Sequence, residues 1–165
     1  ILSHEFHKDF SYDPEQFLSL EGFSGPYIQY TYARAKSILA KSDSSDYKVK
    51  LLETDEEKSL AKLLGIYPSI AEKAGLEITP HIICNYLYEL SQVFNSFYTK
   101  HSVLNAGSEQ IKMSRLALTA ATAQVLKNGL SLLGIETVER MWFTYKSLAD
   151  FIQIGILLLV FNYIS

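Results

Sequence analysis

The sequence contains few of the residues that cross-link or interrupt a chain. Of 165 residues, only one is cysteine, four are proline and eight are glycine. The single Cys84 excludes a disulfide framework within the chain, and its apolar neighbours predict a small buried side chain in a reducing compartment. The long segments without proline or glycine, together with a hydrophobic fraction of 48%, favour one globular domain over a disordered chain.

A strong net charge and the common catalytic motifs are also lacking. The formal net charge is -3, so an RNA contact would require a local patch. The sequence has no Walker loop, no dinucleotide-binding glycine motif and no nucleophile elbow. His4 and His7 are one residue short of the zinc-protease spacing, and we expect no metal site. We therefore expect no catalytic residue and no cofactor in this chain.

The first residues carry no secretory signal. Ile1–Phe10 mixes His, Glu, Lys and Asp with its apolar residues, which favours cytoplasmic localisation. Residue 1 is Ile rather than Met, and this indicates a piece of a longer protein.

Helical periodicity is what the sequence has in abundance. Ser24, with Pro26 two residues later, predicts a helix start, and Thr54 to Glu57 form a capping-box pattern. Gly75 is expected to end a short helix. Helices are expected over residues 15–20, from 24 to about 41, from 54 to about 65, over 69–74, from 79 to about 98 and over 109–133. No strand of useful length is predicted, although short runs such as 47–52 are ambiguous. The fold class is therefore all-α, a bundle of about four to five helices.

The helix that begins near Ser24 has two different faces. One face is apolar, and the other carries Tyr27, Tyr30 and Arg34 at spacings of i, i+3 and i+7. Tyrosines at this spacing are most often half-buried packing residues with a hydrated hydroxyl group. The alternative is a surface that receives a flat, negatively charged ligand.

A second basic stretch is a near match to a catalytic signature. Lys112 to Arg115 (KMSR) resemble the Lys-Met-Ser-Lys sequence that class I tRNA synthetases place around ATP. That signature belongs on a flexible loop, whereas these residues lie one turn inside a predicted helix. We interpret Lys112 and Arg115 as two exposed basic residues on that helix.

Three stretches in series resemble the C-terminal part of arginyl-tRNA synthetase. They are GPYIQYTYAR (25–34), CNYLYELSQVFNSFY (84–98) and SRLALTAATAQVLKNGLSLLGIETVERM (114–141). The resemblance implies a DALR-type helical anticodon-binding domain of class I tRNA synthetases over residues 24–141. It also implies that residues 1–23 are a connector from a catalytic domain that this chain lacks.

The resemblance implies which residues meet the tRNA. The family's aromatic and arginine positions on the first helix fall on Tyr27, Tyr30 and Arg34, and a further aromatic position falls on Tyr98. The C-terminal methionine of the family falls on Met141, whose main chain is implied to approach the middle anticodon base.

The implied function is recognition of the anticodon loop of tRNA-Arg. The parent reaction would be the ATP-dependent attachment of arginine to tRNA, carried out on the catalytic domain of the same parent chain. The alternative is a non-catalytic helical bundle that interacts with protein or membrane.

Two features depart from the family pattern. Phe23 stands where the family has asparagine, and residues 142–165 match nothing in the family. The apolar run over residues 151–164 is short for a bilayer span, which needs about 20 residues. Residues 142–165 are therefore open to three interpretations: a helix docked on the bundle, a membrane-associated segment or a non-native extension.

Overall fold

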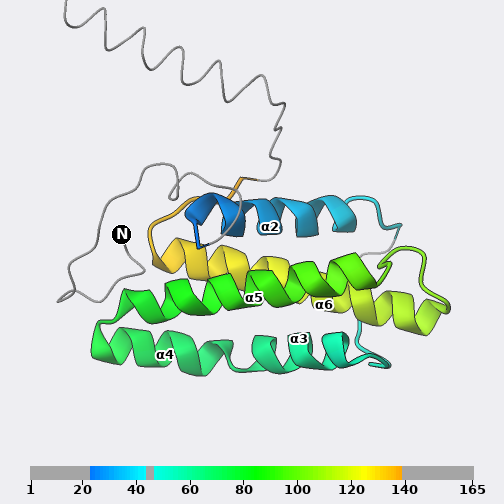
Figure 1. Ribbon diagram of the computed structural model, residues 1–165, viewed down its shortest axis with the longest axis horizontal. Coiled ribbons are helices and arrows are strands. Elements are labelled where there is room, and N and C mark those ends of the chain that lie inside the picture. The colour runs from blue at the N-terminus through cyan, green and yellow to red at the C-terminus, as the bar shows by residue number, and fades with distance from the viewer. Residues whose placement is uncertain (1–22, 44–46, 139–165) are drawn as a thin grey trace, which may run out of the picture.

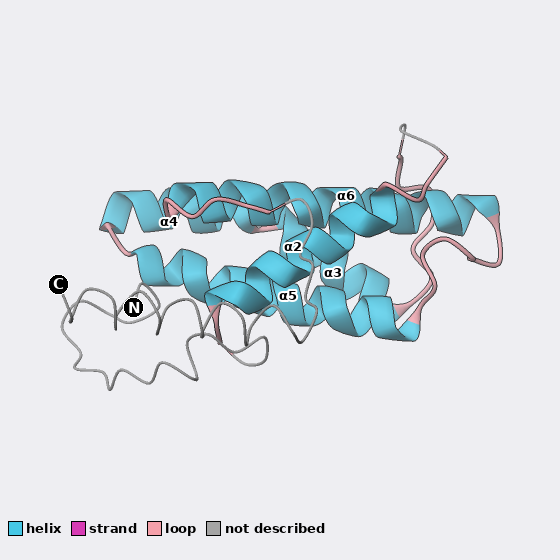
Figure 2. Cartoon of the chain, turned by 90° about the horizontal axis from the view of Figure 1, so that it is seen from above, coloured by secondary structure: helices cyan, strands magenta, loops and turns pink. Residues whose placement is uncertain are grey.

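The computed structural model describes residues 23–43 and 47–138, and in these residues it contains five helices and no strand (Figures 1 and 2). The helices are α2 (Gly25–Leu39), α3 (Asp55–Gly65), α4 (Tyr67–Glu77), α5 (Pro80–Lys100) and α6 (Glu109–Leu132). The all-α fold class is confirmed. The helix expected over residues 15–20 lies outside the described residues.

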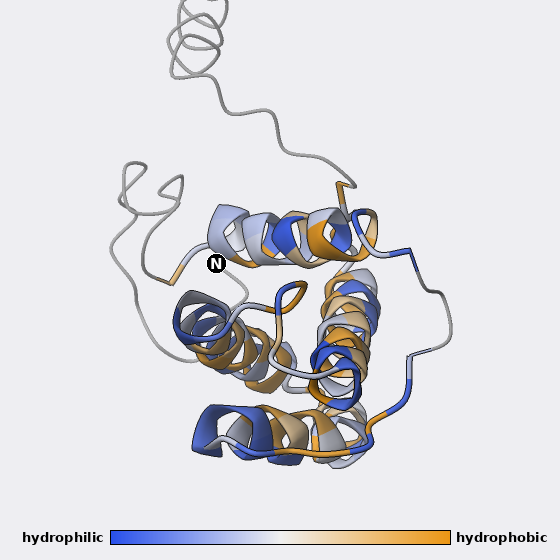
Figure 3. Cartoon of the chain, turned by 90° about the vertical axis from the view of Figure 1, so that its right-hand side faces the viewer, coloured by the Kyte–Doolittle hydropathy of each residue, from blue (hydrophilic) through white to orange (hydrophobic). Residues whose placement is uncertain are grey.

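The helices form a bundle with α5 and α6 in its middle layer (Figure 1). Helix α2 covers one side of this layer, and α3 and α4 follow one another along the opposite side. Both α2 and α3 pack on α5 and α6, whereas α4 packs on α5. Seen end-on, the helices surround a common interior (Figure 3). Helix α6 is therefore packed on two sides, between α2 and α3 as well as against α5.

Side-chain caps set three of the helix starts. The Ser24 hydroxyl accepts a hydrogen bond from the Tyr27 N–H at 3.2 Å, and the Ser108 hydroxyl accepts one from the Ile111 N–H at 3.3 Å. Thr54 and Glu57 complete the predicted capping box at the start of α3. The helix starts expected near residues 24, 54 and 109 are confirmed.

The end of α4 differs from the expectation. The helix continues through Gly75 to Glu77, and Ile78 takes the left-handed conformation with φ of 54°. A glycine inside a helix costs about 1 kcal/mol relative to alanine, which packing can offset. The left-handed conformation of Ile78 turns the chain, and α5 then starts at Pro80.

The core is formed by the inner faces of all five helices. Cys84 is 8% exposed, and burial raises the pKa of its thiol, so it is the small buried side chain that the sequence predicts. A Cβ atom on Gly129 would lie 2.6 Å from a methyl carbon of Leu87, so glycine allows α5 and α6 to approach closely. The largest fully buried apolar side chains are Tyr32, Phe94, Phe97, Leu60, Leu87, Leu90, Leu116, Leu126 and Leu130.

Within residues 23–43 and 47–138, no helix combines the length and the apolar character that crossing a membrane requires. The segment 142–165, for which membrane association is one interpretation, lies outside the described residues.

Candidate nucleic-acid interface

Helix α2 presents two faces, as its spacing predicts. Ile28, Tyr32 and Ala35 are buried in the core. Tyr27, Tyr30 and Arg34 are only partly buried, because they lie at the edge of the core side, where Tyr27 and Arg34 contact Asn95 of α5. Tyr98, near the end of α5, is 40% exposed beside them. We define Tyr27, Tyr30, Arg34 and Tyr98 as the tyrosine–arginine face.

Arg34 is the centre of this face. Its Cζ atom lies 4.7 Å from the centroid of the Tyr30 ring and 5.3 Å from the centroid of the Tyr98 ring. Both distances suit a cation–π interaction, which needs the cation within about 6 Å of the ring centroid. Three of the predicted residues are therefore assembled at one place, although Tyr98 comes from a different helix.

The polar partners of Arg34 in the described residues are neutral. Its Nη1 donates to Oδ1 of Asn95 at 2.5 Å, and its Nη2 donates to the Tyr30 hydroxyl oxygen at 3.2 Å. No carboxylate of residues 23–43 or 47–138 forms a salt bridge with this guanidinium. In the described part of the chain, the positive charge of Arg34 is oriented but not cancelled.

Asn95 also contacts Tyr27, the fourth residue of the tyrosine–arginine face. Its Nδ2 donates to the Tyr27 hydroxyl oxygen and to Oγ1 of Thr31, each at 3.0 Å. Sequence reasoning missed Asn95, because it lies directly after Phe94 within a predicted apolar stripe. The one signal that could have identified it is its spacing of three residues from Tyr98 on the same helix.

Aromatic rings extend the face beyond Tyr27. The Tyr27 and Tyr88 ring centroids are 5.6 Å apart, and the Phe23 ring meets Tyr88 edge-on at 4.6 Å. Tyr88 therefore packs against neighbouring rings. Phe23, which departs from the family pattern, caps this row and has a packing role at the start of α2.

Comparison with known proteins is decisive about the family. The DALR anticodon binding domain family matches residues 28–141, more than two thirds of the chain. The chain belongs to the DALR anticodon-binding domain family. The expected fold and family are confirmed.

Named relatives of this DALR domain are much longer than the chain. The arginine–tRNA ligase of Clostridium kluyveri (strain ATCC 8527) is 42% identical over 145 residues, which are 85% of this chain and 26% of the relative. That of Haemophilus influenzae (strain 86-028NP) is 43% identical over 137 residues, 81% of this chain and 24% of the relative. The solved Thermus thermophilus arginyl-tRNA synthetase is similar with a TM-score of 0.78 and 34% identity, over 84% of this chain and 25% of that one. The chain spans about a quarter of the length of these relatives.

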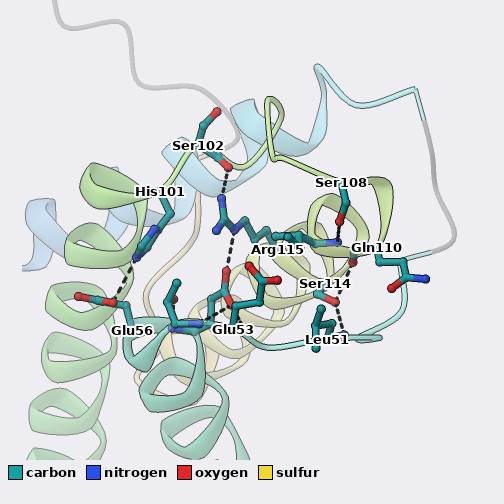
Figure 4. Close-up of polar contacts among 12 residues, drawn as sticks. Leu51, Glu53, Glu56, His101, Ser102, Ser108, Gln110, Ser114 and Arg115 are labelled. Atoms are coloured by element: carbon teal, nitrogen blue, oxygen red, sulfur yellow. Dashed lines mark hydrogen bonds and ion pairs between the residues drawn. The ribbon is translucent and has the colours of Figure 1, made fainter.

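The interpretation of Arg115 as an exposed residue is wrong. Arg115 of this DALR domain is 9% exposed, its Nε donates to Oε1 of Glu57 at 2.7 Å, and its Nη1 donates to the Ser102 carbonyl at 2.8 Å (Figure 4). Ser114 is also buried and accepts hydrogen bonds from the N–H groups of Lys50 and Leu51. The reason is the central position of α6, which turns this part of the helix towards the start of α3.

Glu57 is fully buried, yet its pKa is lowered, so its carboxyl group stays ionised at neutral pH. Burial alone would raise the pKa of Glu57, but hydrogen bonds from Arg115 and from the N–H groups of Thr54 and Glu53 lower it below its usual value. The pKa of the neighbouring Glu56 is lowered to about 2 by hydrogen bonds from Lys100, its own N–H and His101. Both acids lie at the helix start, as predicted, but Glu57 also holds the buried arginine.

Met141, the remaining predicted tRNA contact, lies outside residues 23–43 and 47–138. His4 and His7, for which no metal site is expected, also lie outside them. The last described residues do approach α2, since Nε2 of Gln29 donates to the Glu136 carbonyl at 2.9 Å. In the described part, no group of three His, Cys, Asp or Glu side chains is arranged to hold a metal ion.

The arrangement favours binding over bond-making chemistry. Partly exposed aromatic rings can stack on unpaired bases, and the guanidinium provides a planar fork of donors for phosphate or base-edge atoms.

Proposed function

We propose that this chain is the tRNA anticodon-recognition module of an arginyl-tRNA synthetase, and that the tyrosine–arginine face receives the anticodon loop. The observation that carries the proposal is the position of Arg34 between the Tyr30 and Tyr98 rings, with only neutral polar partners in the described residues. Because these partners are neutral, the guanidinium charge remains available to an anionic ligand.

The physical basis is single-strand recognition. Bases in an RNA loop are splayed out, so aromatic rings can stack on them, and each stacked base contributes about 1–3 kcal/mol. Tyr27, Tyr30 and Tyr98 would supply ring surface, while Arg34 would contact phosphate or a base edge. A domain with a net charge of -3 can bind in this way because the site is local.

The catalytic step belongs to the parent enzyme in this proposal. A catalytic domain of the same parent chain would use ATP to attach arginine to tRNA-Arg in the cytoplasm. Residues 1–23 would connect the two domains, and Met141 would bring its main chain to the anticodon. The isolated chain is expected to bind tRNA without aminoacylating it.

Filter binding with purified tRNAs tests the proposal. The chain should prefer an arginine tRNA over another tRNA, and the Tyr27→Ala/Tyr30→Ala variant should lose this preference while its far-UV circular dichroism stays helical. A matched control is Ile66→Ala/Leu76→Ala, which removes two exposed apolar side chains next to and within α4, on the side of the bundle opposite α2. The control should bind like the wild type.

The rival function predicts different results. A protein- or membrane-interaction bundle would bind all tRNAs equally, or none even at low salt. If residues 142–165 are a membrane segment, binding to lipid vesicles should disappear when they are deleted. Under the tRNA proposal, the same deletion should retain or improve tRNA binding.

A further inference from the structure

The hydrogen bonds of the tyrosine–arginine face have a defined direction. A guanidinium only donates hydrogen bonds, so the Asn95 atom that faces Arg34 must be the carbonyl oxygen Oδ1. The Asn95 amide nitrogen then faces Tyr27 and Thr31, where it acts as the donor. The orientation of the Asn95 amide is therefore set by chemistry.

The donor and acceptor roles in these hydrogen bonds determine which further hydrogen bonds the Tyr27 and Tyr30 hydroxyl groups can make. The Tyr27 hydroxyl oxygen accepts from Asn95, and the Tyr30 hydroxyl oxygen accepts from Arg34. Each phenol has one proton, and neither of these bonds uses it. The Thr31 hydroxyl, in contrast, uses its proton in a hydrogen bond that it donates to the Tyr27 main-chain carbonyl at 2.9 Å, within the helix.

We propose that Asn95 is a positioning residue which orients Arg34 and Tyr27 so that the face presents hydrogen-bond donors to RNA. The ligand atoms that such a face selects are acceptors, namely phosphate oxygens and the carbonyl oxygens or ring nitrogens of unpaired bases. This inference rests on the proposed function, because it names the chemistry of the same site.

Aspartate at position 95 would reverse the arrangement with little change of shape. A carboxylate only accepts, so it would draw the Tyr27 proton inwards and pair with the Arg34 guanidinium. Asn95→Asp should therefore cancel the charge and remove a donor, while leaving the contact between α2 and α5 in place. A purely structural role for Asn95 predicts no such loss.

The test measures binding of the full 165-residue chain to an RNA hairpin with the anticodon stem and loop of an arginine tRNA. Asn95→Asp should weaken binding by about tenfold or more, because it affects hydrogen bonds made by a charged group. The slope of log K against log salt should fall by about 0.7, as for one lost phosphate contact on a single strand. The melting temperature should stay equal or rise.

The control is Asn85→Asp on the same helix. Asn85 is exposed and lies ten residues before Asn95, about 15 Å along the axis. Asn85→Asp adds the same single negative charge as Asn95→Asp, but far from the face. The affinity of the Asn85→Asp variant for RNA should therefore stay within about twofold of the wild type, and its salt slope should not change. Equal losses in both variants would overturn the inference.

A second measurement does not depend on RNA. In the free wild type, the Arg34 guanidinium protons should exchange slowly with water by NMR, and Asn95→Leu should make this exchange fast. Absence of RNA binding by the wild type, with Arg34 still ordered by Asn95, would sink the proposed function alone. Unchanged RNA affinity in Asn95→Asp, or unchanged Arg34 exchange in Asn95→Leu, would sink the positioning role.

Discussion

The two arginines in the helices of this bundle show how differently one side chain can be used. Arg115 is 9% exposed and gives its donors to the Glu57 carboxylate and the Ser102 carbonyl. Arg34 is partly exposed and gives its donors to an amide and a phenol, with aromatic rings beside its guanidinium. Of these two arginines, only Arg115 is paired with a carboxylate of the described residues.

This difference is consistent with a stabilising role for Arg115 and with the recognition role that we propose for Arg34. A buried ion pair holds helices together because removing either partner leaves an uncompensated charge in the interior. An oriented arginine with neutral partners contributes less to stability, but its field remains available to an anionic ligand. Solvent exposure and partner charge therefore distinguish the environments of the two arginines, whereas residue type does not.

The largest expected effect is a loss of stability when the buried Arg115 is replaced. Arg115→Met should lower the free energy of unfolding by about 3–5 kcal/mol, because it leaves Glu57 charged and unpaired. Arg34→Met should lower it by less, about 1–2 kcal/mol, because it removes partly exposed cation–π contacts and two hydrogen bonds to neutral partners. Urea unfolding of the two variants measures both values.

The control for this prediction is the double variant Glu57→Gln/Arg115→Met. Neutralising the acid should restore part of the lost stability, so the two changes should not add. A similar loss of stability in Arg115→Met and Arg34→Met would remove the distinction between the arginines.

An intermediate effect on stability is expected when the pH is lowered. The folded-state pKa of Glu57 is lowered, and that of Glu56 is lowered from 4.5 to about 2. The unfolded chain therefore binds more protons, so the stabilisation is fully present above pH 4.5 and is lost as the pH falls towards 2. Melting temperatures measured across this range should fall less steeply in Glu57→Gln than in the wild type.

The smallest expected effect concerns a single hydroxyl group on the exposed side. Tyr30→Phe removes the oxygen that accepts from Arg34 but keeps the ring. Affinity for an arginine tRNA should fall by about 0.5–1.5 kcal/mol, the contribution of one hydrogen bond. Tyr88→Phe is the control, because its hydroxyl accepts from Gln92, and it should bind like the wild type in the same filter assay.

Much of the fold could be predicted from local signals. Ser24, Thr54 and Ser108 mark helix starts because a side-chain oxygen there satisfies an N–H group that has no partner within the helix. The separation of Tyr27, Tyr30 and Arg34 from the fully buried side of α2 follows from the helical period alone. The family resemblance implied that Tyr98 belongs to the same site, but its position beside Arg34 came from the structure, since no local pattern connects residues 64 positions apart.

Where most helices begin, and which side of each is apolar, follow from local residue order, because capping and periodicity act over a few residues. The burial of Arg115 against Glu57, and the hydrogen bonds of Asn95 with Arg34 and Tyr27, could be seen only in the folded bundle. Both depend on which helices become neighbours, and that depends on how the whole set of apolar surfaces packs together.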